Sequence, residues 1–105
     1  FRRALELNDP LARRNYGIFL YEHDRYSEAE EMLEAAINLG DLKAHVDLGN
    51  VLAETGRAED AERHYLAAIE ANAAGKTARE AYALLLKECG RHDEARDQVR
   101  LAEEE

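Results

Sequence analysis

The sequence has only one cysteine, Cys89, only one proline, Pro10, and no tryptophan. A single cysteine cannot form a disulfide within the chain, so the fold is not a disulfide-stabilised scaffold. No apolar run approaches the roughly 20 residues that cross a bilayer, and no signal-peptide core opens the chain. We therefore expect a soluble cytoplasmic protein. Because the sequence starts at Phe1 without an initiator methionine, we also expect it to be part of something longer.

The length and the charge of the chain exclude further classes of protein. A chain of 105 residues forms one ordinary domain at most, so a multidomain enzyme is excluded. Lysine and arginine number 14 against 23 aspartates and glutamates, a formal net charge of −9. So acidic a chain repels phosphate groups, and we expect neither nucleic acid nor membrane as a partner. The acidity has two interpretations, a solvated helix exterior or a surface that attracts a basic segment.

The sequence repeats itself. Residues 15–20 and 26–29 recur as residues 47–52 and 58–61, in each case 32 residues later. A third copy around Tyr82 follows the second at an offset of 34, and we expect Ala74 and Gly75 to lengthen the connection before it. The predicted organisation is one domain over residues 1–105, consisting of the tail of a truncated repeat (1–8) and repeats at 9–40, 41–73 and 74–105.

Each copy predicts two helices and no strand. Asp9 and Pro10 are typical of a helix start, and we interpret Ser27-Glu30 and Thr77-Glu80 as capping boxes. Glycines mark the helix ends. The expected helices run from Pro10 to Asp24, Ser27 to Gly40, Leu42 to Thr55, Ala58 to Ala71, Thr77 to Cys89 and His92 to Glu103.

Apolar spacing predicts the core of each helix pair. Ala29, Leu33, Ala36 and Ile37 form the buried stripe of one second helix. The first helix before it is expected to bury Tyr16, Phe19, Leu20 and His23. Gly17 and Gly49 lack the side chain that the other positions carry, so they predict close packing between the two helices of a copy.

These features together resemble the tetratricopeptide repeat family. The second copy fits best, the first nearly as well and the third more loosely, and the likeness covers essentially the whole chain. Arg13, His45 and Arg79 stand where the family has tryptophan, which bears on the pitch of the array. The residues of the second copy that match the motif are Leu48, Gly49, Leu52, Gly56, Ala61, Tyr65 and Ala68. The resemblance implies an all-α, right-handed α-solenoid of stacked helix-turn-helix repeats.

The resemblance also implies a function, the binding of a partner peptide or domain in a concave groove lined by the first helix of each pair. Ile18 and Tyr21 lie off the core stripe, so they contact either a partner or the preceding copy. Asn50 could donate to and accept from a peptide backbone. The groove positions that the resemblance implies are Leu11, Arg14, Ile18, Tyr21, Glu22, Lys43, Val46, Asn50, Ala53, Glu54, Thr77, Glu80, Leu84, Lys87 and Glu88.

Some members of the family hold the free carboxylate of a chaperone C-terminus in a clamp of basic and asparagine side chains. This sequence has Arg14 and Asn50 at two clamp positions, but Ile18, Glu80 and Leu84 at the others. Glu80 would repel a carboxylate. We therefore expect no such clamp.

Chemistry at Cys89 is a weaker hypothesis. Cys89 and His92 have the spacing of two zinc ligands, but a zinc site takes about four, and no second cluster of cysteine or histidine is present. Glu88 and Asp93 flank the thiol and disfavour a reactive thiolate. We expect no enzyme activity, no metal and no cofactor.

Two other functions stay open. The chain ends at Phe1 and at Val99 and Ala102 have apolar residues that could support end-to-end self-association of repeats. The chain could also be an accessory domain of a larger enzyme.

Overall fold

The structure is a computed structural model that describes residues 9–104, and over this range it contains six helices and no strand. The predicted tail of a truncated repeat, residues 1–8, lies outside the described residues. The helices are α2 (Pro10–Glu22), α3 (Tyr26–Asn38), α4 (Ala44–Glu54), α5 (Ala58–Glu70), α6 (Lys76–Glu88) and α7 (His92–Glu104).

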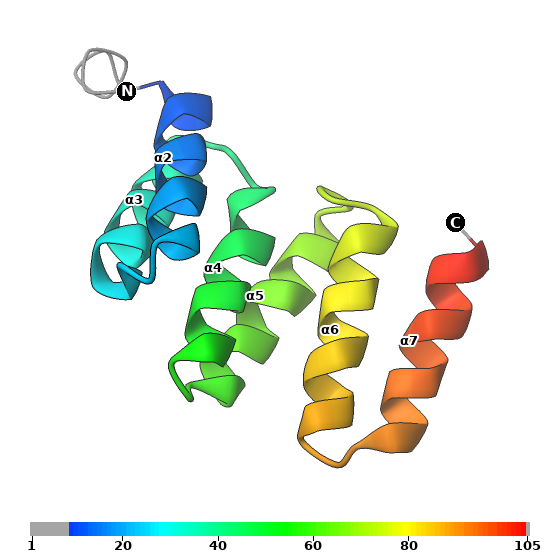
Figure 1. Ribbon diagram of the computed structural model, residues 1–105. Helices are drawn as coiled ribbons and strands as arrows, with labels where there is room; N and C mark the ends of the chain where they lie inside the picture. Colours follow the sequence, from blue (N-terminus) through cyan, green and yellow to red (C-terminus); the bar gives the residue numbers. More distant parts are fainter. Residues whose placement is uncertain (1–8, 105) are drawn as a thin grey trace.

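The helices form three pairs, α2 with α3, α4 with α5 and α6 with α7, stacked side by side (Figure 1). Each pair contacts the next, since α3 and α2 pack against α4, and α5 and α4 pack against α6. The predicted all-α solenoid of helix-turn-helix repeats is therefore confirmed. Within the described part of the chain, no helix is long and apolar enough to span a bilayer.

The helix starts differ from the prediction at the two capping boxes and at α4, which begins at Ala44 and not at Leu42. Asp9 caps α2 as expected, because its carboxylate accepts from the backbone N–H groups of Leu11 and Ala12 at 3.0 and 3.4 Å. The two capping boxes are wrong. Ser27 and Thr77 each lie second in their helices, α3 and α6, and neither helix has a side-chain cap.

The two extra residues before the third pair lengthen a helix instead of a connection. The connections before α4 and α6 are residues 39–43 and 71–75, which are equally long. Helix α4 has 11 residues and α6 has 13. Helix α6 starts at Lys76, which is 32 residues after the start of α4 at Ala44, although the equivalent positions of the two repeats are 34 residues apart.

The core follows the predicted stripe of the second helices. Ala29, Leu33 and Ala36 are fully buried, and Ile37 packs against the cluster while partly exposed. Close packing at the glycines is also confirmed. A Cβ atom on Gly17 would lie 2.7 Å from the Cγ of Leu33.

Three apolar positions differ from expectation. Of the predicted stripe of α2, Leu20 is fully buried, but Phe19 is 42% exposed and His23 is exposed. Phe19 and His23 stack on each other, with ring centroids 4.2 Å apart. Ala102, expected at an exposed apolar end, is only 4% exposed.

Candidate functional site

The first helices α2, α4 and α6 line a series of hollows on one face of the stack. One of them, about 340 Å³, lies between Ile18 of α2, Val46 and Asp47 of α4 and Thr77 of α6. Two smaller hollows of about 160 Å³ each follow it. Ile18 belongs to two of these hollows, and Asn50 also belongs to two. The three are thus contiguous, and we call them together the groove.

Most of the predicted positions lie in the groove. Leu11 lies beside it, in a hollow that it shares with Arg14 and Lys43. Glu80 and Lys87 line a different hollow, between α6 and α7. The predicted residues that line the groove are Arg14, Ile18, Tyr21, Glu22, Lys43, Val46, Asn50, Ala53, Glu54, Thr77, Leu84 and Glu88.

Their accessible surfaces differ. Val46 is only 6% exposed and is mainly a core residue. Ile18 is half-buried. Tyr21 lines the groove and also packs against the core of its own helix pair, with its ring centroid 5.8 Å from that of Tyr26. Leu84, at 59% exposed, is the most accessible apolar side chain of the groove.

Asn50 lies at the centre of the groove. The hydroxyl of Tyr65, a buried residue of α5, donates to its Oδ1 at 2.6 Å. A buried tyrosine usually has such a polar partner. The bond fixes the orientation of the Asn50 amide and directs its two N–H donors to other partners.

The groove lies in a negative electrostatic field. Burial raises the pKa of Tyr21, and the carboxylates of Glu54 and Asp24 raise it further. The pKa of Tyr65 is also raised, first by burial and then by nearby Tyr21, Glu88, Glu54 and Asp47. A phenol resists ionisation where negative charge is close.

Part of this field comes from one repeated position. Glu22, Glu54 and Glu88 are the last residues of α2, α4 and α6, and each lines the groove. We call these three the acidic edge. A carboxylate at a helix C-terminus is opposed by the helix dipole, and neither α2 nor α4 has a basic residue in its last turn.

Two basic residues, Arg14 and Lys43, lie at the other end of the groove, and Arg14 lies beside two carboxylates. The Nε of Arg14 lies 3.6 Å from a carboxylate oxygen of Asp41 and 3.9 Å from one of Asp47. Burial raises the pKa of Asp47 to about 6; Asp41 also raises it, while Arg14 lowers it. Two carboxylates thus compete with any anion for Arg14.

The structure brings together no catalytic or metal-binding set within residues 9–104. Cys89 is exposed, and no cluster of three or more histidine, cysteine, aspartate or glutamate side chains has metal-site geometry in this range. It does pair His45 with His64, whose Nδ1 atoms lie 2.9 Å apart. Burial lowers the pKa of both rings, and each is lowered further by a neighbouring group, His64 for His45 and Arg63 for His64.

The sequence analysis missed several groove residues. Asp47 lines two of the three hollows, and Tyr65 reaches the groove from a second helix. An aspartate between Val46 and Leu48, in the most apolar stretch of the chain, was a usable signal for Asp47. Nothing in the sequence indicated that the Tyr65 ring passes between two first helices.

Comparison with known proteins identifies the repeat. A family model described as tetratricopeptide repeat matches residues 42–67 and 77–100. No curated protein matches the sequence. A crystal structure of MamA superposes with a TM-score of 0.82 at 24% identity, covering 92% of this chain and 58% of that one. A second crystal structure of MamA protein gives a TM-score of 0.83 at 24% identity, covering 96% and 56%. The chain thus spans less than two thirds of these neighbours, and at this identity the likeness shows the fold.

Proposed function

Because this chain contains tetratricopeptide repeats, we propose that it is a protein-interaction module whose groove binds an extended segment of a partner protein in the cytoplasm. The observation that carries the proposal is the contiguous groove across all three first helices, which combines accessible apolar side chains with an oriented amide. The binding is passive and involves no covalent step and no cofactor.

The negative charge of the groove supports a partner segment that carries basic side chains. Glu22, Glu54 and Glu88 form the acidic edge beside the half-buried Ile18 and Tyr21. A segment with lysine or arginine side chains next to an apolar one matches this arrangement. The acidity that the sequence left with two interpretations is, on this proposal, partly a binding feature.

Each groove residue has a definite task. Ile18 and Leu84 contact apolar side chains of the segment, and Asn50 donates to a backbone carbonyl. The acidic edge pairs with basic side chains at the groove margin, where such pairs mainly set specificity and association rate. A free C-terminal carboxylate is disfavoured at Arg14, because Asp41 and Asp47 lie 3.6 and 3.9 Å from its Nε and compete for it.

A charge reversal tests the proposal. A displayed library of random 12-residue peptides is selected on the wild-type chain and on Glu54→Lys, which reverses the centre of the acidic edge. The matched control is Glu70→Lys, since Glu70 is likewise exposed and the last residue of its helix, α5. Peptides enriched on the wild type should contain lysine or arginine beside an apolar residue.

These peptides should bind the control variant as they bind the wild type and should bind Glu54→Lys at least about tenfold more weakly. Equal binding to all three chains, or enrichment of acidic peptides, contradicts the proposed groove.

End-to-end association of repeats is the second candidate. Val99, which no neighbouring helix covers among the described residues, is 45% exposed and favours a contact at the α7 end of the stack. The chain spans 58% of the first MamA structure, so a role as one part of a larger array or of an enzyme remains within this second proposal.

A further inference from the structure

Two histidines link the helices of the second pair. The Nδ1 atoms of His45 on α4 and His64 on α5 lie 2.9 Å apart, and the ring centroids lie 5.2 Å apart. Both rings are half-buried. A hydrogen bond between two imidazole nitrogens needs one ring to donate an N–H and the other to accept on a lone pair. At least one of the two rings is therefore neutral while the bond exists.

The third helix pair makes the same contact without a titrating group. His45 and His64 correspond to Arg79 and Gln98, which follow them by 34 residues. There Nη1 of Arg79 donates to Oε1 of Gln98 at 3.0 Å. Arginine stays charged and glutamine stays uncharged between about pH 5 and 8, the range in which histidine titrates. The link between the two helices is therefore sensitive to pH in the second pair and not in the third.

The histidine link lies at a helix start that no side chain caps. Helix α4 has 11 residues, whereas each of the other described helices has 13. Lys43 precedes it without a side-chain cap. The backbone N–H groups of residues 44, 45 and 46 donate to carbonyl oxygens three residues earlier, at 3.1, 3.2 and 3.1 Å. Such bonds have poorer geometry than those of a regular α-helix. The bond of His45 to α5 therefore supports the first turn of α4.

The surroundings of the two rings oppose a charge on both of them. Burial lowers the pKa of His45 and of His64, and the neighbouring ring lowers that of His45 further. Arg63 of α5 also lowers the pKa of His64, while Glu30 of α3 raises it. Glu30 is already paired with Arg57 at 2.6 Å. Within residues 9–104, the charges that shift the pKa of either ring come from α3 and α5.

The linked rings take up protons in two steps that belong to the pair and not to either ring. A first proton leaves one ring neutral, so the cationic ring still donates across the pair and the bond is kept. A second proton makes both rings cationic and leaves neither Nδ1 with a lone pair. The hydrogen bond is then lost and the two charges repel each other.

We propose that the His45–His64 pair is a pH-sensitive switch that joins α4 to α5 at neutral pH and releases the first turn of α4 in acid, when both rings are protonated. In the unfolded chain both histidines protonate below about pH 6.5. Because the folded pair resists the second proton, the folded state loses stability as the pH falls. Lys43, Val46 and Asp47 of the released segment form one edge of the groove. The proposal does not depend on a partner in the groove.

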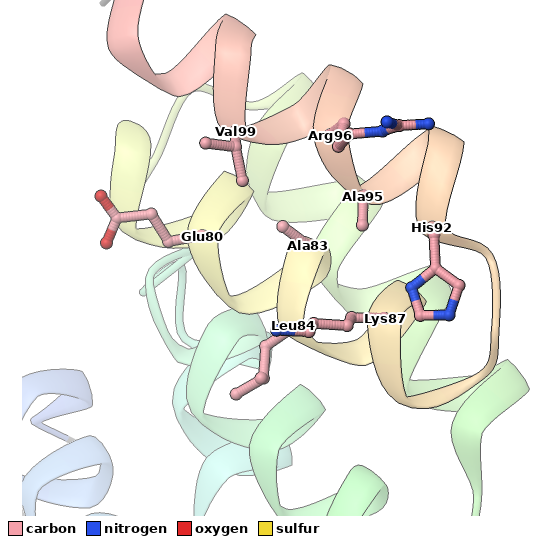
Figure 2. A pocket seen from close by; sticks show the side chains of 8 residues that line it. All are labelled: Glu80, Ala83, Leu84, Lys87, His92, Ala95, Arg96 and Val99. Carbon is pink, nitrogen blue, oxygen red and sulfur yellow. The ribbon is translucent and has the colours of Figure 1, made fainter.

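Urea unfolding from about pH 7.5 to about pH 5 tests the proposal in a chain that carries Asp47→Asn. This background removes a carboxyl two residues from His45, whose pKa of about 6 changes the stability in the opposite direction. The test variant His45→Arg, His64→Gln copies the arginine–glutamine contact of the third pair. The matched control is His92→Gln, which removes an exposed histidine at the start of α7, outside the pair (Figure 2).

Over this pH range the urea midpoint of the background chain should fall by about 0.5 M more than that of the test variant. The control should follow the background chain. An equal pH dependence of the background chain and the test variant overturns the proposal.

A second measurement needs no substitution at the pair. In the Asp47→Asn chain, ring ¹⁵N NMR at about pH 7.5 should find opposite tautomers, with the proton on Nδ1 of one ring and on Nε2 of the other. In acid, the order parameters of the backbone amides of residues 44–46 should fall from about 0.85 toward about 0.6. Those of residues 78–80, the equivalent positions of α6, should not change.

The same tautomer in both rings overturns the hydrogen bond on which the switch depends. Unchanged order parameters of residues 44–46 after both rings have titrated overturn the release of α4. Neither result bears on the peptides selected on the groove, so this proposal and the proposed function fail separately.

Discussion

At the scale of single residues, the position where the two helices of a pair approach each other has different residues in each of the three pairs. Gly17 accommodates Leu33, and Gly49 accommodates Tyr65. The corresponding residues of the third pair are Ala83 and Val99. The third pair therefore has a larger residue on its first helix and a smaller residue on its second helix than the other two pairs have.

This exchange predicts the outcome of a double-mutant cycle. A Cβ atom on Gly49 would lie 2.5 Å from Cε1 of Tyr65, whose ring is buried and hydrogen-bonded to Asn50. The overpacking cost of about 1–3 kcal/mol should exceed the roughly 1 kcal/mol gain in helix propensity, so Gly49→Ala lowers the free energy of unfolding. Tyr65→Val also lowers it, because it leaves a cavity and an unpaired amide.

The double variant Gly49→Ala, Tyr65→Val introduces the same two residue types that the third pair has at Ala83 and Val99. Urea unfolding should show it to be more stable than the sum of the single changes, by about 1 kcal/mol or more. Additive effects would mean that the two positions do not share one packing site.

Asp47 makes a second prediction at this scale. Its pKa in the folded chain is about 6 against an ordinary value of 3.8. Between these values the folded state binds more protons than the unfolded state, so this carboxyl lowers stability as the pH rises through 6. Asp47→Asn should therefore be more stable than the wild type near pH 7, by at most about 3 kcal/mol.

The advantage of Asp47→Asn should shrink as the pH falls toward about 4, where the wild-type carboxyl is protonated in the folded chain. Asp97→Asn is the control, because Asp97 is an exposed aspartate within α7; its effect should stay within about 0.5 kcal/mol at both pH values. A pH-independent gain for Asp47→Asn would contradict the assigned titration.

At the scale of helices, one turn motif determines where the second helices begin. The backbone N–H of Arg25 donates to Leu20 O at 2.9 Å, and Arg57 and Arg91 donate in the same way to Leu52 and Leu86. These are Schellman-type bonds that close the preceding helix. Because the donor is also the residue before the next helix, Ser27 falls inside α3 and cannot act as its cap.

The two capping boxes failed for this reason. The sequence pattern of Ser27 and Glu30 satisfied a local rule, but a bond to the preceding helix had already placed the start of α3. Arg25 instead pairs its guanidinium with Glu28, at 2.7 Å. Local motifs could predict that helices start near these residues, and only the hairpin geometry determined which residue starts them.

The backbone conformation at the start of α6 predicts that Gly75 tolerates substitution less well than Gly56. Gly75 has φ 55° and ψ −135°, a region open essentially to glycine alone, whereas Gly56 has φ 78° at a Schellman turn. Gly75→Asn should cost about 1–3 kcal/mol in urea unfolding. Gly56→Asn should be nearly neutral, because asparagine tolerates the left-handed conformation. Equal costs would contradict the assigned backbone at Gly75.

At the scale of the whole molecule, the period of the sequence predicted the array well. Recurrence at offsets of 32 and 34 identified three helix pairs, and the resemblance to the tetratricopeptide repeat predicted which faces of the first helices line a groove. What the period could not give were contacts made by residues that differ between copies. His45 pairs with His64, and Arg79 with Gln98 at 3.0 Å, where the family has one large aromatic residue.

The α7 end of the stack also differs from what the sequence pattern predicted. The sequence drew attention to Val99 and Ala102 together as an apolar end, yet the structure buries Ala102 and exposes Val99. Which side of α7 remains uncovered depends on how α7 packs against α6, and the sequence of α7 alone does not describe that contact.

The pattern of contacts finally predicts how the array unfolds. Helix α4 contacts α2, α3, α5 and α6, whereas α7 contacts α6 alone among the described helices. Stability in such a stack is the sum of repeat and nearest-neighbour terms, so α7 can detach while α4 stays covered. Native-state hydrogen exchange should therefore be slowest for the amides of α4 and fastest for those of α7. Uniform exchange along the chain would show instead that the three pairs open as one cooperative unit, in which the end contributes as much as the centre.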